Sequence, residues 1–168
     1  MIVLVCGGRD YADRVSAFTF LDWVHARHLV TRLVNGGAAG GDELSDAWAV
    51  ARGFPDTAIG RYPAAWDDLS APGAVARRSR SGKLYNVRAG LERNRLMLRR
   101  EGPDMVAALP GGRGTWDMMS IALKAGVPVL PFAHWRAGET ELIRSQTELA
   151  RIIPPPALRR RAAAGALS

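Results

Sequence analysis

Cysteine is almost absent from this chain of 168 residues, which contains only Cys6. A single cysteine cannot form an internal disulfide, and it leaves no cysteine cluster to bind zinc. The three histidines are not spaced as metal ligands either. We therefore expect a cytoplasmic protein that has no structural metal and needs no cofactor.

Long apolar runs are missing as well. No stretch approaches the roughly 20 apolar residues that a membrane-spanning helix needs. The chain opens with a short apolar run, residues 2–6 (IVLVC), which has no basic residue before it and is followed directly by glycine. This pattern predicts a buried strand rather than a signal peptide, and we expect no membrane partner.

Aromatic residues make up only 7% of the chain, whereas basic charge is concentrated in one segment. Residues 74–100 contain nine Lys or Arg residues and one acid, Glu92, so this segment carries +8 and the rest of the chain carries −1. A localised patch favours an anionic partner, although a solvated loop and helix face would have the same composition. Nucleic acid is one such partner, but only Tyr85 is available there for base stacking.

Strands and helices alternate along the sequence. Apolar runs predict strands at residues 2–6, 29–34, 57–62, 105–109 and 127–132, and the spacing predicts helices at 14–28, 42–52, 91–100, 116–124 and 139–152. Residues 67–90 show no clear period and are predicted as a long basic loop. This order predicts a single Rossmann-like, doubly wound α/β domain with a mainly parallel sheet of about five or more strands and helices on both faces. We place the domain at residues 1–153 and a proline-rich, basic tail at 154–168.

Three glycine-rich segments follow predicted strands, at residues 7–8, 36–41 and 111–114. The carboxyl ends of parallel strands share one edge, where ligands bind in such sheets. A glycine loop that enters a helix can direct several backbone N–H groups at one phosphate, although glycines also close ordinary turns. The pattern matches neither the dinucleotide fingerprint nor a Walker loop. The phosphate-binding residues predicted on these loops are Gly7, Gly8, Arg9, Gly36, Gly37, Gly40, Asp42, Gly111, Gly112, Arg113, Gly114 and Thr115.

Several residues near these loops have two interpretations. Asp10 could bind a ribose hydroxyl or act as a general acid or base, or it could cap the next turn. Asp42 could contact the ligand or cap a helix. Trp116 could stack on a base, although its spacing also fits the core.

Several motifs, in order and at sensible spacing over about residues 1–132, resemble the YspA-related branch of the SLOG superfamily. They are residues 1–11 (MIVLVCGGRDY), 35–42 (NGGAAGGD), 47–49 (AWA), the pair Arg93-Asn94 with Met97, and 110–118 (PGGRGTWDM). The resemblance implies a Rossmann-like fold and the binding or sensing of a nucleotide or nucleotide-derived ligand, with Asn94 among the ligand-binding residues. It does not imply an established reaction.

Two other SLOG groups suggest alternative functions. The "lonely guy" phosphoribohydrolases, which cleave the N-glycosidic bond of cytokinin nucleotides, have an arginine that Arg93 matches and a PGGxGTxxE motif. Met118 stands at the glutamate position of that motif, and Asp117, one residue earlier, is turned by about 100° on a helix. A hydrolase would therefore use Asp10 or Asp117 together with Arg93. Analogy with these hydrolases also predicts a homodimer.

The DNA-processing protein A group, which binds single-stranded DNA, suggests the third function, a nucleic-acid-binding module that uses residues 74–100. We favour nucleotide binding, with the basic segment as a lid over a small ligand. Its glycine and serine content would permit closure, and its aromatic content is low for a base-stacking groove.

Overall fold

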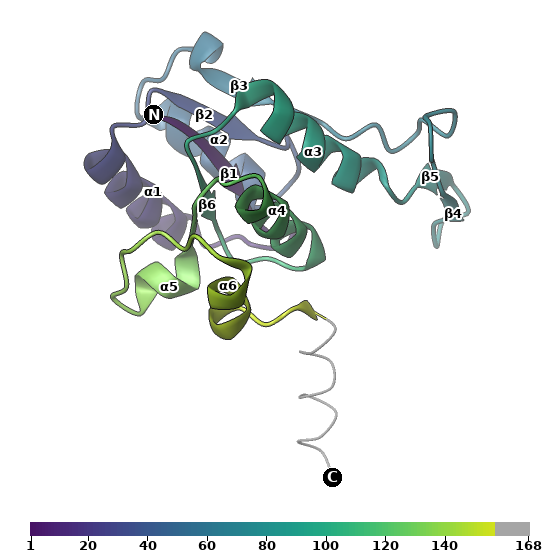
Figure 1. The fold of residues 1–168 in the computed structure, drawn as a ribbon. Coiled ribbons are helices and arrows are strands. Elements are labelled where there is room, and N and C mark those ends of the chain that lie inside the picture. Colours follow the sequence, from purple (N-terminus) through teal and green to yellow (C-terminus); the bar gives the residue numbers. More distant parts are fainter. Residues whose placement is uncertain (157–168) are drawn as a thin grey trace.

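The apolar run at the start of the chain forms the central strand of a parallel sheet (Figure 1). The computed structural model describes residues 1–156, in which five parallel strands have the order β3-β2-β1-β6-β7. Their bounds are β1 Ile2–Cys6, β2 Arg32–Asn35, β3 Ile59–Arg61, β6 Met105–Ala108 and β7 Val129–Pro131. Both faces of β1 are covered, as the unbroken apolar run predicts.

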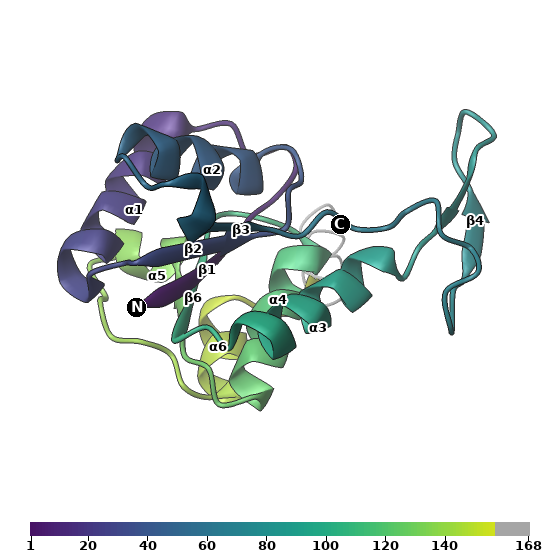
Figure 2. The same ribbon diagram turned by 90° about the horizontal axis from the view of Figure 1, so that it is seen from above.

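Helices cover both faces of this sheet, which confirms the predicted Rossmann-like α/β class. Side chains of α1, α2 and α5 pack on one face, and those of α3, α4 and α6 pack on the other. Figure 2 shows α1 and α2 on the opposite side of the sheet from α3, α4 and α6. Their bounds are α1 Arg14–His28, α2 Gly41–Ala51, α3 Ala89–Glu101, α4 Arg113–Lys124, α5 Phe132–Arg136 and α6 Gln146–Ile152, and a 3-10 turn, Asp56–Ala58, precedes β3.

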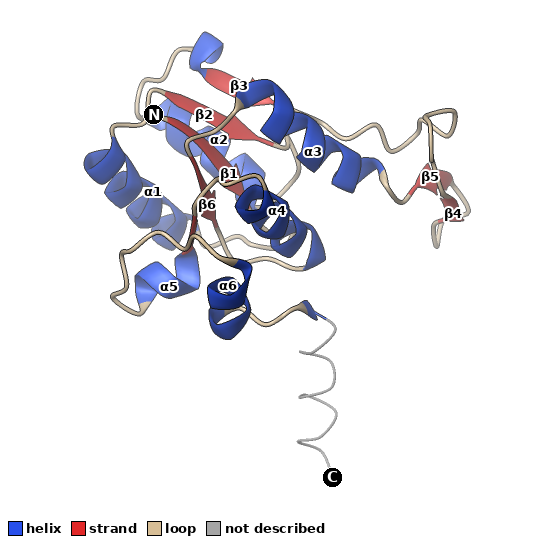
Figure 3. Ribbon diagram, viewed as in Figure 1, coloured by secondary structure: helices blue, strands red, loops and turns tan. Residues whose placement is uncertain are grey.

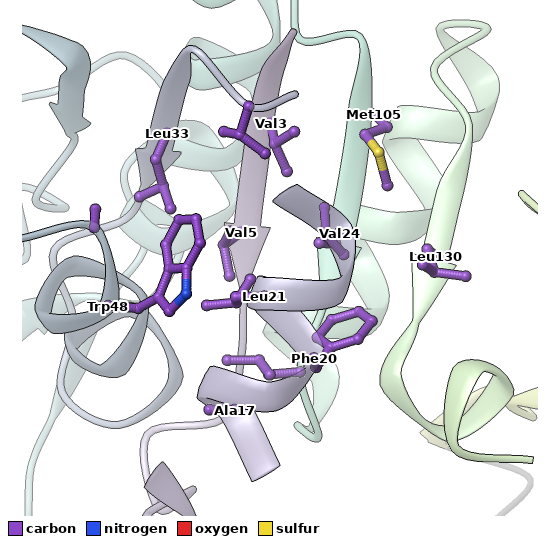
Figure 4. Close-up of a cluster of buried hydrophobic side chains, with 14 of the residues drawn as sticks. Val3, Val5, Ala17, Phe20, Leu21, Val24, Leu33, Trp48, Met105 and Leu130 are labelled. Carbon is purple, nitrogen blue, oxygen red and sulfur yellow. The ribbon is translucent and has the colours of Figure 1, made fainter. Parts of the chain in front are cut away.

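The core follows the alternation of side chains along β1. Val3 and Val5 join the cluster beneath α1 and α2, whereas Leu4 and Cys6 join the cluster beneath α3 and α4. Figure 4 shows the first cluster, with Val5 near the Trp48 indole. Trp48 is therefore a core residue. No helix in the described part of the chain is long and apolar enough to cross a membrane.

The second strand and the last helix are shorter than predicted. β2 begins at Arg32, three residues late, because Leu29 takes a left-handed conformation (φ 50°) and ends α1. The helix predicted at 139–152 occupies only Gln146–Ile152, where the Ser145 hydroxyl accepts a hydrogen bond from the Glu148 N–H and caps it. The short helix α5, directly after β7, was not predicted.

The region predicted as a long loop contains a β-hairpin. Strands β4 (Ala76–Arg78) and β5 (Leu84–Asn86) pair antiparallel and stand apart from the main sheet, beyond the start of α3 (Figure 3). We call residues 66–88 the basic arm, because they contain five Lys or Arg residues and two acids. The prediction of an unstructured loop was therefore wrong for these strands, and α3 begins at Ala89 rather than at residue 91.

Buried Asn86 holds the base of the basic arm. Its side-chain carbonyl accepts hydrogen bonds from the N–H groups of Val75 (3.2 Å) and Arg88 (3.0 Å). Its own N–H donates to the Trp66 carbonyl at 2.7 Å. The arm therefore leaves the body of the protein in a defined direction. Of the predicted tail, Pro154 to Pro156 are described, and residues 157–168 lie outside the described part of the chain.

Candidate functional site

The three glycine-rich segments meet at the carboxyl edge of the sheet. The Gly8 N–H donates to the Pro110 carbonyl at 2.9 Å, and the Gly8 carbonyl accepts from the Gly41 N–H at 3.0 Å. The loop after β1 is therefore bonded to both of the other loops, as the shared edge of a parallel sheet predicts.

Close packing of the backbone explains several of these glycines. A Cβ on Gly7 would lie 2.8 Å from the Gly41 Cα, so the loop after β1 and the start of α2 touch through their backbones. Gly111 leaves the space that the Thr115 side chain fills. These glycines are needed by the fold whether or not a ligand is bound.

Gly112 and Gly114 are different, because a Cβ at either position would meet nothing within 4 Å. Gly112 is the N-cap of α4, and no side chain caps this helix, which begins three residues earlier than predicted. The first N–H groups of any helix have no acceptor within the helix, and they carry its positive dipole end. The start of α4 is therefore open to an anion, beside the buried side chain of Thr115 (5% exposed).

A cavity of about 680 Å³, which we call the arm cavity, lies between these loops, α3 and the basic arm. Among the predicted residues, Asp10 and Arg93 line it, and so do ten of the proposed ligand-binding positions. Those ten are Gly7, Gly8, Arg9, Gly36, Asp42, Asn94, Gly112, Arg113, Gly114 and Thr115. Gly37, Gly40 and Gly111 do not line this cavity.

Arg93 forms the floor of the arm cavity together with Asp42. Its guanidinium donates to the carbonyls of Gly36 and Tyr62 and lies 3.7 Å from the Asp42 carboxylate. Gly36 makes room for this group, since a Cβ there would collide with the guanidinium. Both charged side chains are largely buried, with 15% and 6% of their surface exposed.

The Asp42 carboxylate also accepts a hydrogen bond from the Ala38 N–H at 3.3 Å. Burial raises the pKa of Asp42 and lowers the pKa of Arg93, and the charge of each partner opposes the shift of the other. Asp42 is not the N-cap of α2, because Gly40 holds that position. Its interpretation as a helix cap was therefore wrong, and its charge is paired with Arg93.

Asn94 joins α3 to the first turn of α4. Its amide donates to the Asp117 carboxylate at 3.0 Å and to the Gly114 carbonyl at 3.3 Å, and its oxygen accepts from Arg93 Nε at 3.1 Å. Asp117 faces a second cavity of about 810 Å³, beside α6, and does not line the arm cavity. Of the three proposed catalytic residues, Asp10 and Arg93 line the arm cavity, whereas Asp117 lines only the second cavity and is linked to Arg93 through Asn94. The two cavities share the start of α4.

Met118 and Trp116 both make contacts within the fold. Met118 of α4 is fully buried in the core, so the position of the glutamate of the related hydrolases holds an apolar side chain. The Trp116 indole N–H donates to the Ile153 carbonyl at 3.3 Å, and the Trp116 side chain lines the second cavity.

Burial raises the pKa of Cys6, so its thiol stays protonated at neutral pH.

The basic arm supplies cavity residues that were not predicted individually. Trp66, Arg77, Tyr85 and Arg88 all line the arm cavity. The Arg9 guanidinium lies 4.7 Å from the centre of the Trp66 ring, which is a cation–π contact between the loop after β1 and the arm. In the sequence, Arg77 and Arg88 stood out only as members of the basic segment and Tyr85 as its one aromatic residue, and no signal indicated Trp66.

Comparison with known proteins gives two matches. The family described as the YspA, cpYpsA-related SLOG family matches residues 1–68. The Gene 61 protein of Mycobacterium phage D29 is 33% identical over 136 residues, which cover 77% of this chain and 94% of the phage protein. No solved structure matches the chain significantly.

Proposed function

We propose that this chain, which belongs to the YspA, cpYpsA-related SLOG family, binds a nucleotide or nucleotide-derived ligand in the arm cavity. The ligand's phosphate lies against the first turn of α4. The observation that carries this proposal is the contrast among the glycines. Gly7 and Gly111 are explained by close packing, whereas Gly112 and Gly114 face open space beside unpaired helix N–H groups.

The charge and size of the arm cavity support this proposal. Arg9, Arg77, Arg88 and Arg113 line it, and Asp10 is the one lining acid besides the paired Asp42. Its volume of about 680 Å³ falls within the range of about 300–1,000 Å³ typical of small-molecule sites. A nucleotide is therefore accommodated by both space and charge.

Binding or sensing is favoured over hydrolysis of an N-glycosidic bond. A hydrolase of the related type needs a carboxylate that faces the sugar, and Asp117 is instead bonded to Asn94 outside the arm cavity. Asp10 is the one exposed carboxylate on the cavity wall, so a hydrolytic activity would depend on it. We therefore propose a binding role in which Arg93 organises the floor of the site.

Mass spectrometry of nucleotides released from the purified protein tests the proposed function. We expect the wild-type protein and the Gly112→Ala variant to release a nucleotide, because the added methyl group meets open space. We expect the Gly112→Asp variant to release none, because its carboxylate lies where the phosphate binds. Release of equal amounts from all three proteins, or from none of them, would contradict the proposal.

A further inference from the structure

The face of the basic arm that borders the cavity carries a cation and an aromatic ring. Arg77 of β4 lies directly across from Tyr85 of β5, and both line the arm cavity. The next pair, Arg78 and Leu84, points to the opposite face of the hairpin, since side chains alternate along a strand. Arg78 instead donates to the Gly82 carbonyl at 2.7 Å.

The position of this face is fixed by contacts at the base of the arm. Asn86 bonds to three backbone groups there, and Trp66 packs against Gly90 at the start of α3. The matched region of the family ends at residue 68, before the hairpin. The hairpin of β4 and β5 therefore lies outside the part of the chain that the family model matches.

The cavity has two separate positive centres. One is the start of α4 with Arg113, and the other is the side of the arm, with Arg77, Arg88 and Arg9, which stacks on Trp66. Arg88 is partly neutralised by Glu92 at 3.6 Å, and Arg93 is neutralised by Asp42. Within the described residues, Arg77 has no ion-pair partner. A single phosphate on α4 would leave this second centre without a counter-charge.

We infer that the ligand carries two phosphate groups, as a nucleoside diphosphate or a diphosphate-bridged nucleotide does. This inference rests on the proposed function, because the first phosphate occupies the start of α4. The second phosphate binds Arg77, whose planar guanidinium matches phosphate oxygens with two parallel hydrogen bonds. Tyr85 lies directly across the hairpin from Arg77 and borders the same part of the cavity.

Calorimetric titration with ADP and AMP tests this inference, together with pyrophosphate and phosphate, which remove any dependence on the base. We expect the wild-type protein to bind ADP at least about tenfold more tightly than AMP. The Arg77→Gln variant should lose about tenfold in affinity for ADP and pyrophosphate and keep its affinity for AMP and phosphate. The control, Arg80→Gln, removes the same charge from the exposed tip of the arm and should change neither affinity.

The outcomes separate the two proposals. Equal affinities for ADP and AMP in the wild-type protein, both abolished by Gly112→Asp, would overturn the second phosphate and leave the proposed function intact. Equal losses in the Arg77→Gln and Arg80→Gln variants would also overturn it, because they would indicate general electrostatic attraction. A wild-type protein that binds none of the four compounds would overturn both proposals.

Discussion

Gly36 is needed because the Arg93 guanidinium occupies the space that a side chain would take. That guanidinium bonds to the Gly36 carbonyl and neutralises buried Asp42. The family resemblance indicated Arg93, and the glycine motif indicated Gly36, but neither pattern predicted that the two residues touch. The contact joins α3 to the loop after β2, which are far apart in the sequence.

A methyl group at Gly36 should displace Arg93 and leave the Asp42 charge poorly compensated. We expect the Gly36→Ala variant to lose about 1–3 kcal/mol of unfolding free energy, which is typical of an unpaired buried polar group. Urea denaturation at neutral pH measures this loss. Gly112→Ala is the control, since its methyl group meets open space and it should lose at most about 0.5–1 kcal/mol, because alanine is a weaker N-cap than glycine. Equal stability of Gly36→Ala and the wild-type protein would show that Arg93 relocates without cost.

Some elements were predicted well from the sequence, whereas β2, α6 and the hairpin were not. β1 has its predicted bounds because an unbroken apolar run followed by glycine marks a buried strand. α1 also has its predicted bounds, where Asp13 caps its start and Leu29 ends it. β4 was missed because all three of its residues are exposed and none is buried in the core. Its pairing depends on Asn86, whose role is set by tertiary contacts.

The first turn of α4 also escaped prediction, with consequences for the site. Apolar spacing begins at Trp116, so the glycines before it were predicted as loop, whereas the helix starts at Arg113. Glycine is tolerated at an N-cap, and the first helical residues need no apolar face. The glycine-rich segment at 111–114 therefore follows its strand as predicted, but its last part belongs to the helix.

The basic arm would bind single-stranded DNA differently from a small ligand. A nucleic-acid groove releases counterions from several phosphates, so log affinity falls with log salt by about 0.7 per phosphate contacted. We expect only weak oligonucleotide binding with a shallow salt slope, because few aromatic residues are available for stacking. Fluorescence anisotropy with a labelled oligonucleotide measures the slope.

The matched variant for this experiment replaces Arg77, Arg78, Arg80 and Lys83 with serine. It should change the salt slope little if the arm covers a small ligand. Submicromolar, sequence-independent binding at about 150 mM salt, with a slope that this variant flattens by about three units, would contradict this expectation and support a nucleic-acid-binding module.

Helix α3 connects the candidate site to the sheet. Its last residue, Glu101, forms two hydrogen bonds with the Arg32 guanidinium of β2, at 2.7 and 2.8 Å. The Tyr62 hydroxyl donates to the same carboxylate at 2.6 Å. The other half of α3 carries Arg93 and Asn94. One helix therefore joins the start of β2 to the arm cavity.

These hydrogen bonds lower the pKa of Glu101, with Arg32 as the largest cause. Its contribution to stability is therefore fully present above the unfolded-state pKa, which is about 4.3, and is lost as the pH falls through the lower folded-state pKa. We expect Glu101→Gln to be less stable than the wild-type protein at pH 7, and the difference to shrink below about pH 4.

Urea denaturation across this pH range measures the effect. The control is Glu141→Gln, which removes an exposed carboxylate. A difference between Glu101→Gln and the wild-type protein that stays constant from pH 7 to pH 3 would contradict the assignment of this stability to the ionised carboxylate.

The most direct test of phosphate binding at α4 combines calorimetry with thermal unfolding of the two Gly112 variants. Aspartate is a favoured N-cap residue, so Gly112→Asp should unfold at or above the temperature of the wild-type protein. The same variant should show no heat of binding with ADP, whereas Gly112→Ala should bind ADP with nearly wild-type affinity. Unchanged ADP affinity in a folded Gly112→Asp protein would contradict the account, because an added carboxylate cannot share the start of α4 with a phosphate.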